Sequence, residues 1–301
     1  MQVIVPVAVT DAILTSHNVA EPDAGETVWA PATTYAAGAT VIRTQTHRIY
    51  RSLQASNVGN TPESSPTWWS DAGPTNRWAM FDTQVSTATV RNSPLVVELT
   101  LATRCNAIGL FGLVGASLLV EVLDGATLVY NRTVPLLDQQ PPTDWWEYFY
   151  APIVQRTAVV LNDLVPFGGA RVKITLTAAS GQVRCGALSI GLTRNLGDSL
   201  YGVSTGIKDY SVKNYDPLTE AISLSKKTFS KALSCRTQMP EGAIDGVVTV
   251  LEALRATPVV WLSTEDDRFE SLNVFGFYED FAVEFNHAGV AYCSLKIQGM
   301  N

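Results

Sequence analysis

Alternation of hydrophobic and polar residues is the strongest pattern in the middle of this chain. In the segment 171–177 (RVKITLT), Val172, Ile174 and Leu176 share one face of an extended strand, and polar residues separate them. Comparable runs, separated by turn residues, occupy 87–92, 95–102, 106–113, 117–124, 127–134 and 185–193. Strands at such regular spacing predict two packed antiparallel sheets, a jelly-roll-like β-sandwich over 75–195.

The pattern changes to helical spacing in the last third of the chain. Within 241–255 the apolar residues that recur at this spacing are Ile244, Val247, Val248, Leu251 and Leu254. Pro258 ends the predicted helix, and the apolar run 259–263 (VVWLS) predicts a buried strand. The segment 206–239 predicts two further strands. We therefore expect a C-terminal β-rich α+β domain with one packed helix over 196–301.

The N-terminal part divides into a leader and a small aromatic module. Residues 1–28 open with the β-branched run VIVPVAV, which predicts a leader strand. Residues 29–74 are rich in aromatic and turn residues, with short strands expected at ATVIR and HRIYRSL. The predicted fold class is mainly β: a small aromatic β module, a jelly-roll-like sandwich and the C-terminal domain.

Composition and charge limit the classes of partner. Only 16% of residues are charged, which suits a surface partly covered by neighbouring subunits. The net charge of −7 disfavours nucleic acid as a partner. The longest apolar run, 107–123, is interrupted by glycines, so we expect no membrane insertion. The four cysteines lack C-x-x-C spacing, which favours buried free thiols over a thiolate metal cluster; they are Cys105, Cys185, Cys235 and Cys293.

The tetrapeptide GDSL (197–200) matches an esterase motif in which Ser199 would be the nucleophile. A serine mechanism also needs a histidine base with a nearby carboxylate, and the chain contains no D-x-x-H. Its three histidines, His17, His47 and His287, lie in different segments. We interpret GDSL as a turn between domains. The sequence predicts no enzyme, no catalytic residues, no cofactor and no metal.

Aromatic residues provide the candidate ligand-binding sites. The small module resembles chitin- and cellulose-binding modules in a pattern formed by Trp29, Tyr35, Gly38, Val41, Tyr50, Pro62 and Trp68. This resemblance implies sugar binding by ring stacking. Tyr35, Val41 and Tyr50 are expected in the core, which leaves Trp69 as the exposed ring of the module. A second glycan-binding candidate comprises Trp145, Trp146 and Tyr148, in a connection expected to cross one end of the sandwich.

The string GPTNRWAMFD (73–82) is interpreted as a joint between the module and the sandwich. Gly73-Pro74 would turn the chain out of the module. Trp78 and Phe81, together with Met80, would insert into the sandwich. Arg77 and Asp82 would pair across the turn.

The order of these segments resembles one family of structural proteins. The aromatic module, TNRWAMFD and VELTLATRCNAIGLFGLVG together resemble tail-tip (baseplate) proteins of long-tailed, siphophage-type bacteriophages, over most of 1–195. LYGVSTGIKDYS, the predicted helix and ATPVVWLS resemble the ring-forming domains of phage distal tail proteins. The resemblance implies a structural subunit made in the host cytoplasm and located at the virion tail tip. The implied partners are further copies in a ring, trimer or hexamer, and tail-tube, distal tail, hub and fibre proteins.

Two other functions remain open at the level of sequence. One is a glycan-binding attachment protein that recognises the host surface, and the other is an envelope-degrading hydrolase that uses Ser199. For the structural function, the apolar segments VVWL and NVFGFY carry few charges that would protect a strand edge. They predict a subunit interface in which each copy continues its neighbour's sheet, with Phe277 as the residue to test.

Overall fold

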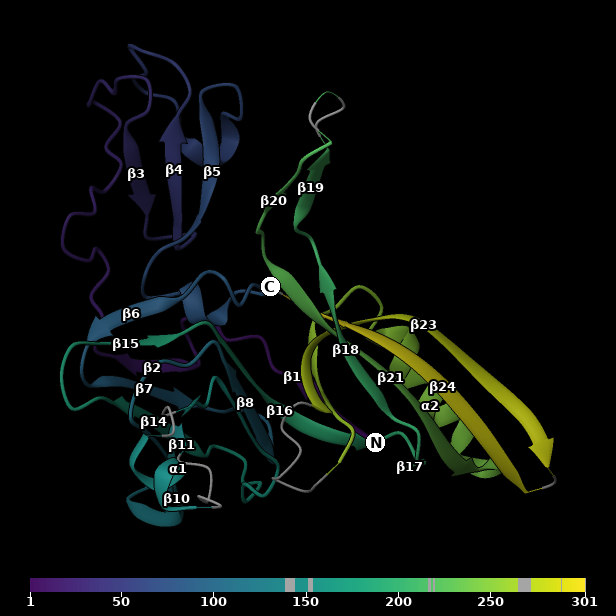
Figure 1. The fold of residues 1–301 in the computed structure, drawn as a ribbon. Coiled ribbons are helices and arrows are strands. Elements are labelled where there is room, and N and C mark those ends of the chain that lie inside the picture. The colour runs from purple at the N-terminus through teal and green to yellow at the C-terminus, as the bar shows by residue number, and fades with distance from the viewer. Residues whose placement is uncertain are drawn as a thin grey trace.

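The chain is mainly β in the computed structural model, with strands in every region and few helices (Figure 1). The structure describes residues 1–138, 144–150, 154–215, 218, 220–264, 272–287 and 289–300. In that part of the chain, no helix is both long enough and apolar enough to cross a bilayer. The predicted fold class is confirmed.

A ten-stranded antiparallel sheet runs through most of the molecule. Its strand order is β13 (Ala158–Leu161), β8 (Ala107–Phe111), β16 (Ala187–Asn195), β1 (Gln2–Pro6), β22 (Val259–Leu262), β23 (Asn273–His287), β24 (Val290–Gly299), β21 (Phe229–Pro240) and β17 (Asp198–Ser199), with β18 (Ser204–Asp209) also paired to β21. The predicted leader strand therefore lies in the middle, because β1 pairs with β16 on one side and β22 on the other. The sheet continues across the boundary expected near residue 195.

The sandwich forms where a second sheet covers one part of the first. The second sheet has the order β10 (Thr127–Pro135), β9 (Ser117–Asp124), β14 (Arg171–Thr177), β7 (Leu95–Thr100) and β2 (Leu14–His17). Shorter pairs at its borders are β6 (Thr89–Asn92) with β15 (Gln182–Cys185), and β11 (Leu137–Asp138) with β12 (Val154–Gln155). Alternate residues of β14 are buried, as predicted, and form one core with β8 and β16.

The small module forms a sheet of its own, with the order β3 (Thr40–Arg43), β4 (Arg48–Ser52) and β5 (Trp69–Pro74), and it carries the 3₁₀ turn η1 (Pro62–Ser64). Its core consists of Tyr35, Val41, Tyr50 and Trp69. The two strands expected from ATVIR and HRIYRSL are confirmed. In Figure 1 the module stands above the sandwich.

The C-terminal lobe packs one helix against the sheet. Helix α2 (Ile244–Ala253) follows the 3₁₀ turn η3 (Glu241–Ala243) and buries Ile244, Val247 and Leu251. These residues contact strands β1, β21, β22 and β24, so the predicted helix and its apolar face are confirmed. All four residues of β22 are buried between β1 and β23. VVWL is thus a central strand and not the exposed edge that its composition suggested.

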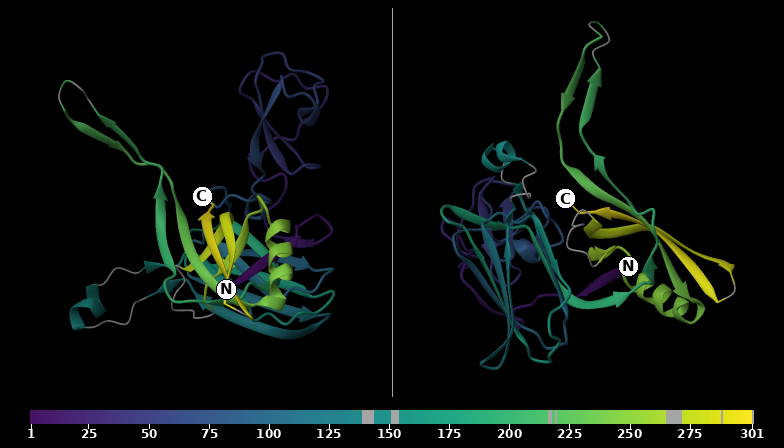
Figure 2. Two further views of the ribbon diagram at one scale, coloured as in Figure 1. Left: turned by 90° about the vertical axis from the view of Figure 1, so that its right-hand side faces the viewer. Right: turned by 60° about the horizontal axis from the view of Figure 1, so that its bottom comes forward.

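A long hairpin projects from this lobe. The segment predicted as two strands forms β18, β19 (Val212–Tyr215), β20 (Ile222–Ser225) and β21, in which β18 pairs with β21 and β19 pairs with β20. We call residues 204–229 the arm. Figures 1 and 2 show the arm extending well away from the rest of the protein.

Candidate functional site

The joint between module and sandwich is built around one buried carboxylate. The Glu21 side chain is only 7% exposed, and its oxygens accept hydrogen bonds from the Thr75 hydroxyl at 2.7 Å and the Trp78 indole N–H at 3.2 Å. His47 Nδ1 lies 2.8 Å from the same carboxylate. Buried carboxylates require such partners because burial removes their hydration. Glu21 therefore connects His47 of the module with Thr75 and Trp78, which lead into the sandwich.

His47 completes this joint from the module side. Its ring stacks on Trp78 with centroids 4.1 Å apart, and its Nε2 lies 3.1 Å from Asp11 Oδ2. Both nitrogens face carboxylates, so both bonds form together only when each nitrogen carries a hydrogen. The His47 carbonyl also accepts from the Thr75 N–H at 2.9 Å. These contacts span the sequence from Asp11 to Trp78 and support the joint interpretation of GPTNRWAMFD.

The joint prediction needs two corrections. Trp78 and Met80 are buried in the sandwich core, and Phe81 packs against it from the turn η2 (Ala79–Phe81), as expected. The turn expected at Gly73-Pro74 is wrong, because both residues end strand β5 and pair with Ile49 and Arg48; Gly73 adopts φ +115° at a register shift in this strand. Asp82, however, does not pair with Arg77 in the described structure; it accepts from the Thr87 hydroxyl and the Gln84 N–H. Burial raises the pKa of the Asp82 carboxyl, and the hydrogen bond from Thr87 opposes this shift.

The GDSL segment forms a turn and a short strand. Gly197 has φ +103°, and a Cβ there would lie 2.5 Å from the Gln238 carbonyl oxygen, so a side chain would not fit. The Ser199 hydroxyl donates to the Ser263 carbonyl at 2.8 Å, directly after the end of β22. This bond uses the only proton of the hydroxyl for a structural contact. The turn expected at GDSL is present at Gly197, and Ser199 lies in the short strand that follows it.

The aromatic glycan candidates lie in two different environments. The structure places Trp69 in the module core at 3% exposed, with its N–H donating to the Asn60 carbonyl at 2.9 Å. Its proposed role as an exposed stacking ring is therefore wrong. Trp145 and Trp146 lie on the short helix α1 (Trp145–Tyr150), and most of each side chain is exposed. Tyr148 lies on the same helix, but its side chain is outside the described residues. Sugar binding by this helix stays a prediction.

The arm carries apolar side chains that its own chain leaves uncovered. Every residue of β18, β19 and β20 is exposed. The large apolar side chains among the exposed arm residues are Ile207, Val212, Tyr215, Leu218, Ile222, Leu224 and Phe229. The arm also contains four lysines against three acidic residues, in a chain with a net charge of −7. Exposed apolar groups in such a number on one projection are typical of an interaction surface.

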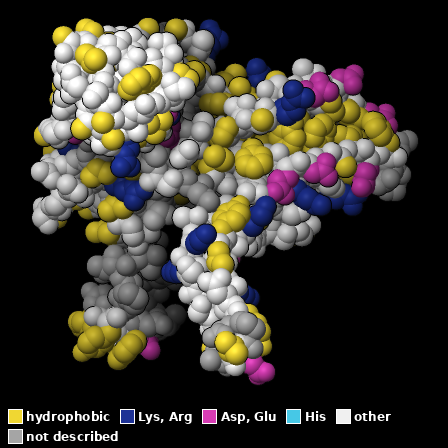
Figure 3. Space-filling view, turned by 90° about the horizontal axis from the view of Figure 1, so that it is seen from above, with side chains coloured by type: hydrophobic (Ala, Val, Ile, Leu, Met, Phe, Trp, Pro, Cys, Tyr) yellow, Lys and Arg dark blue, Asp and Glu magenta, His cyan; other side chains and the backbone are white. Residues whose placement is uncertain are grey.

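A second uncovered surface lies on the C-terminal lobe. Strand β22 pairs with β23 only over Asn273–Gly276, whereas β24 pairs with β23 as far as His287. One edge of β23 beyond Gly276 therefore has no strand beside it among the described residues. Tyr278, Phe281 and Val283 on this length are partly buried, and Phe285 is 67% exposed. Figure 3 shows a hydrophobic band along this lobe, bordered by charged side chains.

Sequence reasoning expected an interface at NVFGFY, which lies on β23, but it did not identify the arm as an exposed surface. The residues that it missed are the arm's exposed apolar groups, above all Ile222 and Leu224. A signal was present: the runs 204–215 and 222–234 flank the turn-forming pair Asp216-Pro217, as in one long hairpin. Phe277, predicted at an interface, is half-buried on β23 and pairs with Gln298.

No protein-family model matches this chain, and no curated protein matches it either. A functional proposal therefore depends on the arm, the β23 edge and the joint.

Proposed function

We propose that this chain is a structural subunit of the tail tip, or baseplate, of a long-tailed bacteriophage. It assembles with copies of itself and with tail-tube, distal tail or hub proteins, and it supports host attachment without catalytic turnover. The observation that carries the proposal is the arm, a projecting hairpin whose apolar side chains are exposed. The resemblance of residues 1–195 to tail-tip proteins supplies the biological setting, a virion made in a bacterial cytoplasm.

The arm requires a partner on physical grounds. An isolated two-stranded hairpin is marginally stable in water, because neither face is covered and few contacts offset the lost chain entropy. Burial of side chains such as Leu218, Ile222 and Leu224 against another protein would stabilise the hairpin by about 1.5–3 kcal/mol per fully buried residue. An arm of this kind is best suited to lock subunits together.

The β23 edge is a suitable receptor for the arm of a neighbouring copy. Beyond Gly276 this edge has no strand beside it among the described residues, so it can accept another strand, and Phe281 and Phe285 provide apolar contacts beside it. Strand β23 carries Asp280 as well as Glu279 and Glu284, which pair with Lys208 and Arg236 of the same chain. The arm carries the further lysines Lys213, Lys226 and Lys227. A contact between different surfaces of identical copies closes into a ring when the rotation permits it. This arrangement agrees with the sheet continuation expected from the sequence.

The decisive experiment shortens the arm while keeping its base. Tyr210 and Thr228 face each other, since the Tyr210 N–H donates to the Thr228 carbonyl at 3.2 Å. Replacement of residues 211–227 by Asn-Gly should therefore close a tight hairpin. We expect sedimentation analysis to show a folded monomer for this variant and an oligomer for the full chain.

A matched pair of point variants separates apolar contact from added charge. Leu224→Asp places a carboxylate on an exposed apolar position of β20, and Ser223→Asp places one on its neighbour. Leu224→Asp should dissociate the oligomer, whereas Ser223→Asp should not. A full chain that remains monomeric at high concentration and is absent from purified virions would rule out the proposal. Antibody labelling of whole tails in electron micrographs would give the location directly.

A further inference from the structure

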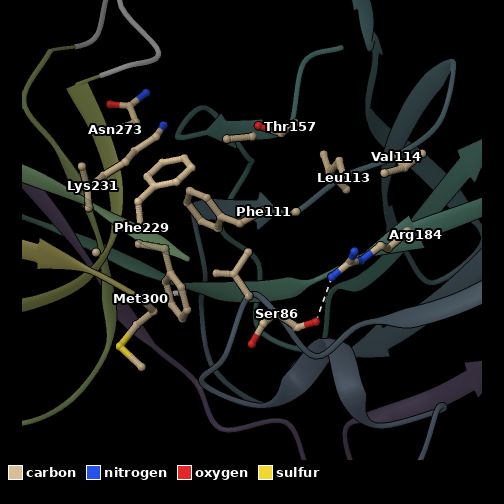
Figure 4. A pocket seen from close by; sticks show the side chains of 16 residues that line it. Ser86, Phe111, Leu113, Val114, Thr157, Arg184, Phe229, Lys231, Asn273 and Met300 are labelled. Atoms are coloured by element: carbon tan, nitrogen blue, oxygen red, sulfur yellow. Dashed lines mark hydrogen bonds between the residues drawn. The ribbon is translucent and has the colours of Figure 1, made fainter. Parts of the chain in front are cut away.

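An apolar cleft lies between the sandwich and the C-terminal lobe. Its volume is about 360 Å³, and its walls include Phe111 and Leu113 from one side and Phe229, Phe275 and Met300 from the other (Figure 4). The rings of Phe111 and Phe275 stack with centroids 5.3 Å apart. This volume lies in the usual range of ligand sites. The cleft is thus large enough for aromatic side chains and lined by groups that would stack with them.

Polar groups without partners accompany this apolar lining. Burial lowers the pKa of the Lys231 ammonium, and no described carboxylate lies within ion-pair distance of it. Arg184 donates from Nη2 to the Ser86 carbonyl at 2.8 Å, but its buried Nε has no acceptor in the part of the chain that the structure describes. The buried Oδ1 of Asn273 accepts no hydrogen bond from the described residues. The cleft therefore combines aromatic walls with two cations, and it is complementary to an aromatic segment that also carries carboxylates.

The chain contains one such segment, residues 144–150, which we call the aromatic lobe. Its sequence is DWWEYFY, and no lysine, arginine or histidine occurs between residues 137 and 155. Trp145, Trp146, Phe149 and Tyr150 are each at least two-thirds exposed. The Trp146 and Tyr150 rings contact each other with centroids 5.5 Å apart. A helix as short as α1 (Trp145–Tyr150) is not stable in water by itself, so its ordering favours a second surface against which the rings pack.

We propose that the aromatic lobe of one copy docks into the cleft of a second copy. Its rings pack against Phe229 and against the stacked pair of Phe111 and Phe275, while its acidic residues face Lys231 and Arg184. The inference rests on the proposed self-assembly, and it adds a contact distinct from that of the arm. Figure 2 shows the lobe standing away from the body of its own chain, so a neighbouring copy is the occupant that fits. The contact joins unlike surfaces and is compatible with a closed ring.

Site-specific photo-crosslinking tests this contact in the full-length protein. A benzophenone amino acid in place of Trp146 is introduced into isotopically heavy chains, which are mixed with light chains before irradiation. We expect cross-linked heavy–light peptides that contain residues 111–114, 229–231 or 299–300. Lys231→Glu in the light chain should lower their yield about tenfold, because reversal of a desolvated charge weakens such contacts strongly.

Arg104→Glu provides the matched control. It makes the same change of charge at an exposed sandwich position next to the opposite end of β8 from Phe111, and it should leave the yield unchanged. Crosslinks confined to one chain, or to other surfaces, would overturn the inference. So would a lobe that binds host polysaccharide through Trp145 and Trp146 while no heavy–light product forms. If the full chain forms an arm-dependent oligomer without cleft crosslinks, only this inference fails; if no oligomer forms at all, the proposed function fails with it.

Discussion

Strands β14 and β20 both alternate apolar and polar residues, yet they lie in opposite environments. In β14, Ile174 and Leu176 are at most 3% exposed, with strands on both sides and a second sheet against their face. In β20, Ile222 and Leu224 are 67% and 70% exposed, and β19 is the partner strand. The sandwich covers its apolar faces with its own chain, whereas the arm presents them to solvent.

This difference shows what alternation means physically. A period of two specifies a strand with one apolar face, but it does not specify what covers that face. In the sandwich the cover comes from strands distant in the sequence. In the arm we propose that it comes from another copy. The following predictions test this contrast, from the largest expected change in the free energy of unfolding to the smallest.

A leucine pair gives the largest contrast. Leu176→Ala should lower the free energy of unfolding by about 2–5 kcal/mol, because it leaves a cavity in a packed core. Leu224→Ala should change it by no more than about 0.5 kcal/mol in a monomeric sample, because that side chain is exposed. Urea denaturation at low protein concentration measures both. Equal losses would mean that the arm folds back onto its own chain in solution.

Acid should lower the free energy of unfolding because of the buried His17 in the sandwich. Burial, followed by the charges of Arg77 and Arg91, lowers the pKa of His17 from 6.5 to about 4. The unfolded chain therefore takes up a proton that the folded chain refuses as the pH falls from 6.5 to 4, and stability is lost in that window. The loss reaches about 3 kcal/mol at most.

His17→Leu should flatten this part of the stability profile, measured by denaturation at a series of pH values. Asp209 in the arm is the comparison. Hydrogen bonds from Ser211 lower the pKa of Asp209, but this carboxyl is fully exposed and screened by solvent. Asp209→Asn should leave the profile of the monomer unchanged, and a profile of His17→Leu identical to that of the parent chain would contradict the assignment.

The small module should be separable from the body, since it has its own core. Deletion of residues 29–72 should leave a folded protein that is less stable by about 1–3 kcal/mol, because Glu21 loses its contact with His47. His47→Ala in the full chain should produce a similar loss. Calorimetry and solubility measure both, and an insoluble deletion variant would show that the module belongs to the main core.

Thiol reactivity should distinguish the buried native cysteines from a cysteine placed on the arm, and it requires no change in the free energy of unfolding. All four cysteines are buried and free, and burial raises the pKa of Cys185 to about 12. Their thiols should react with an aromatic disulfide reagent only after denaturation. Ser223→Cys should add one thiol on the exposed arm that reacts at once in the monomer and slowly in the oligomer. Rapid reaction of the native cysteines would contradict the buried assignment.

Much of the fold followed from local patterns. The periods of two and 3.6 residues identified the sandwich strands and helix α2, because backbone geometry alone sets these periods, and the continuous apolar run VVWLS identified β22. Gly73, whose φ of +115° favours glycine, lies at the register shift near the end of β5, where the chain leaves the module. The joint around Trp78 also had a local signature, because the large rings of Trp78 and Phe81 follow closely after Gly73-Pro74.

Long-range pairing decided what local patterns could not. Trp68 and Trp69 are adjacent, and the pairing of Trp69 with Ser52 in β5 and β4 determines which ring is buried. Asp82 accepts hydrogen bonds from Thr87 and Gln84 instead of pairing with Arg77, because the loop after η2 brings those donors closer. Strand β1 connects the sandwich with the C-terminal lobe because it pairs with β16 on one side and with β22 on the other. The sequence by itself determined which residues form strands and helices, whereas tertiary structure decided which faces are covered, since burial depends on partners far away along the chain.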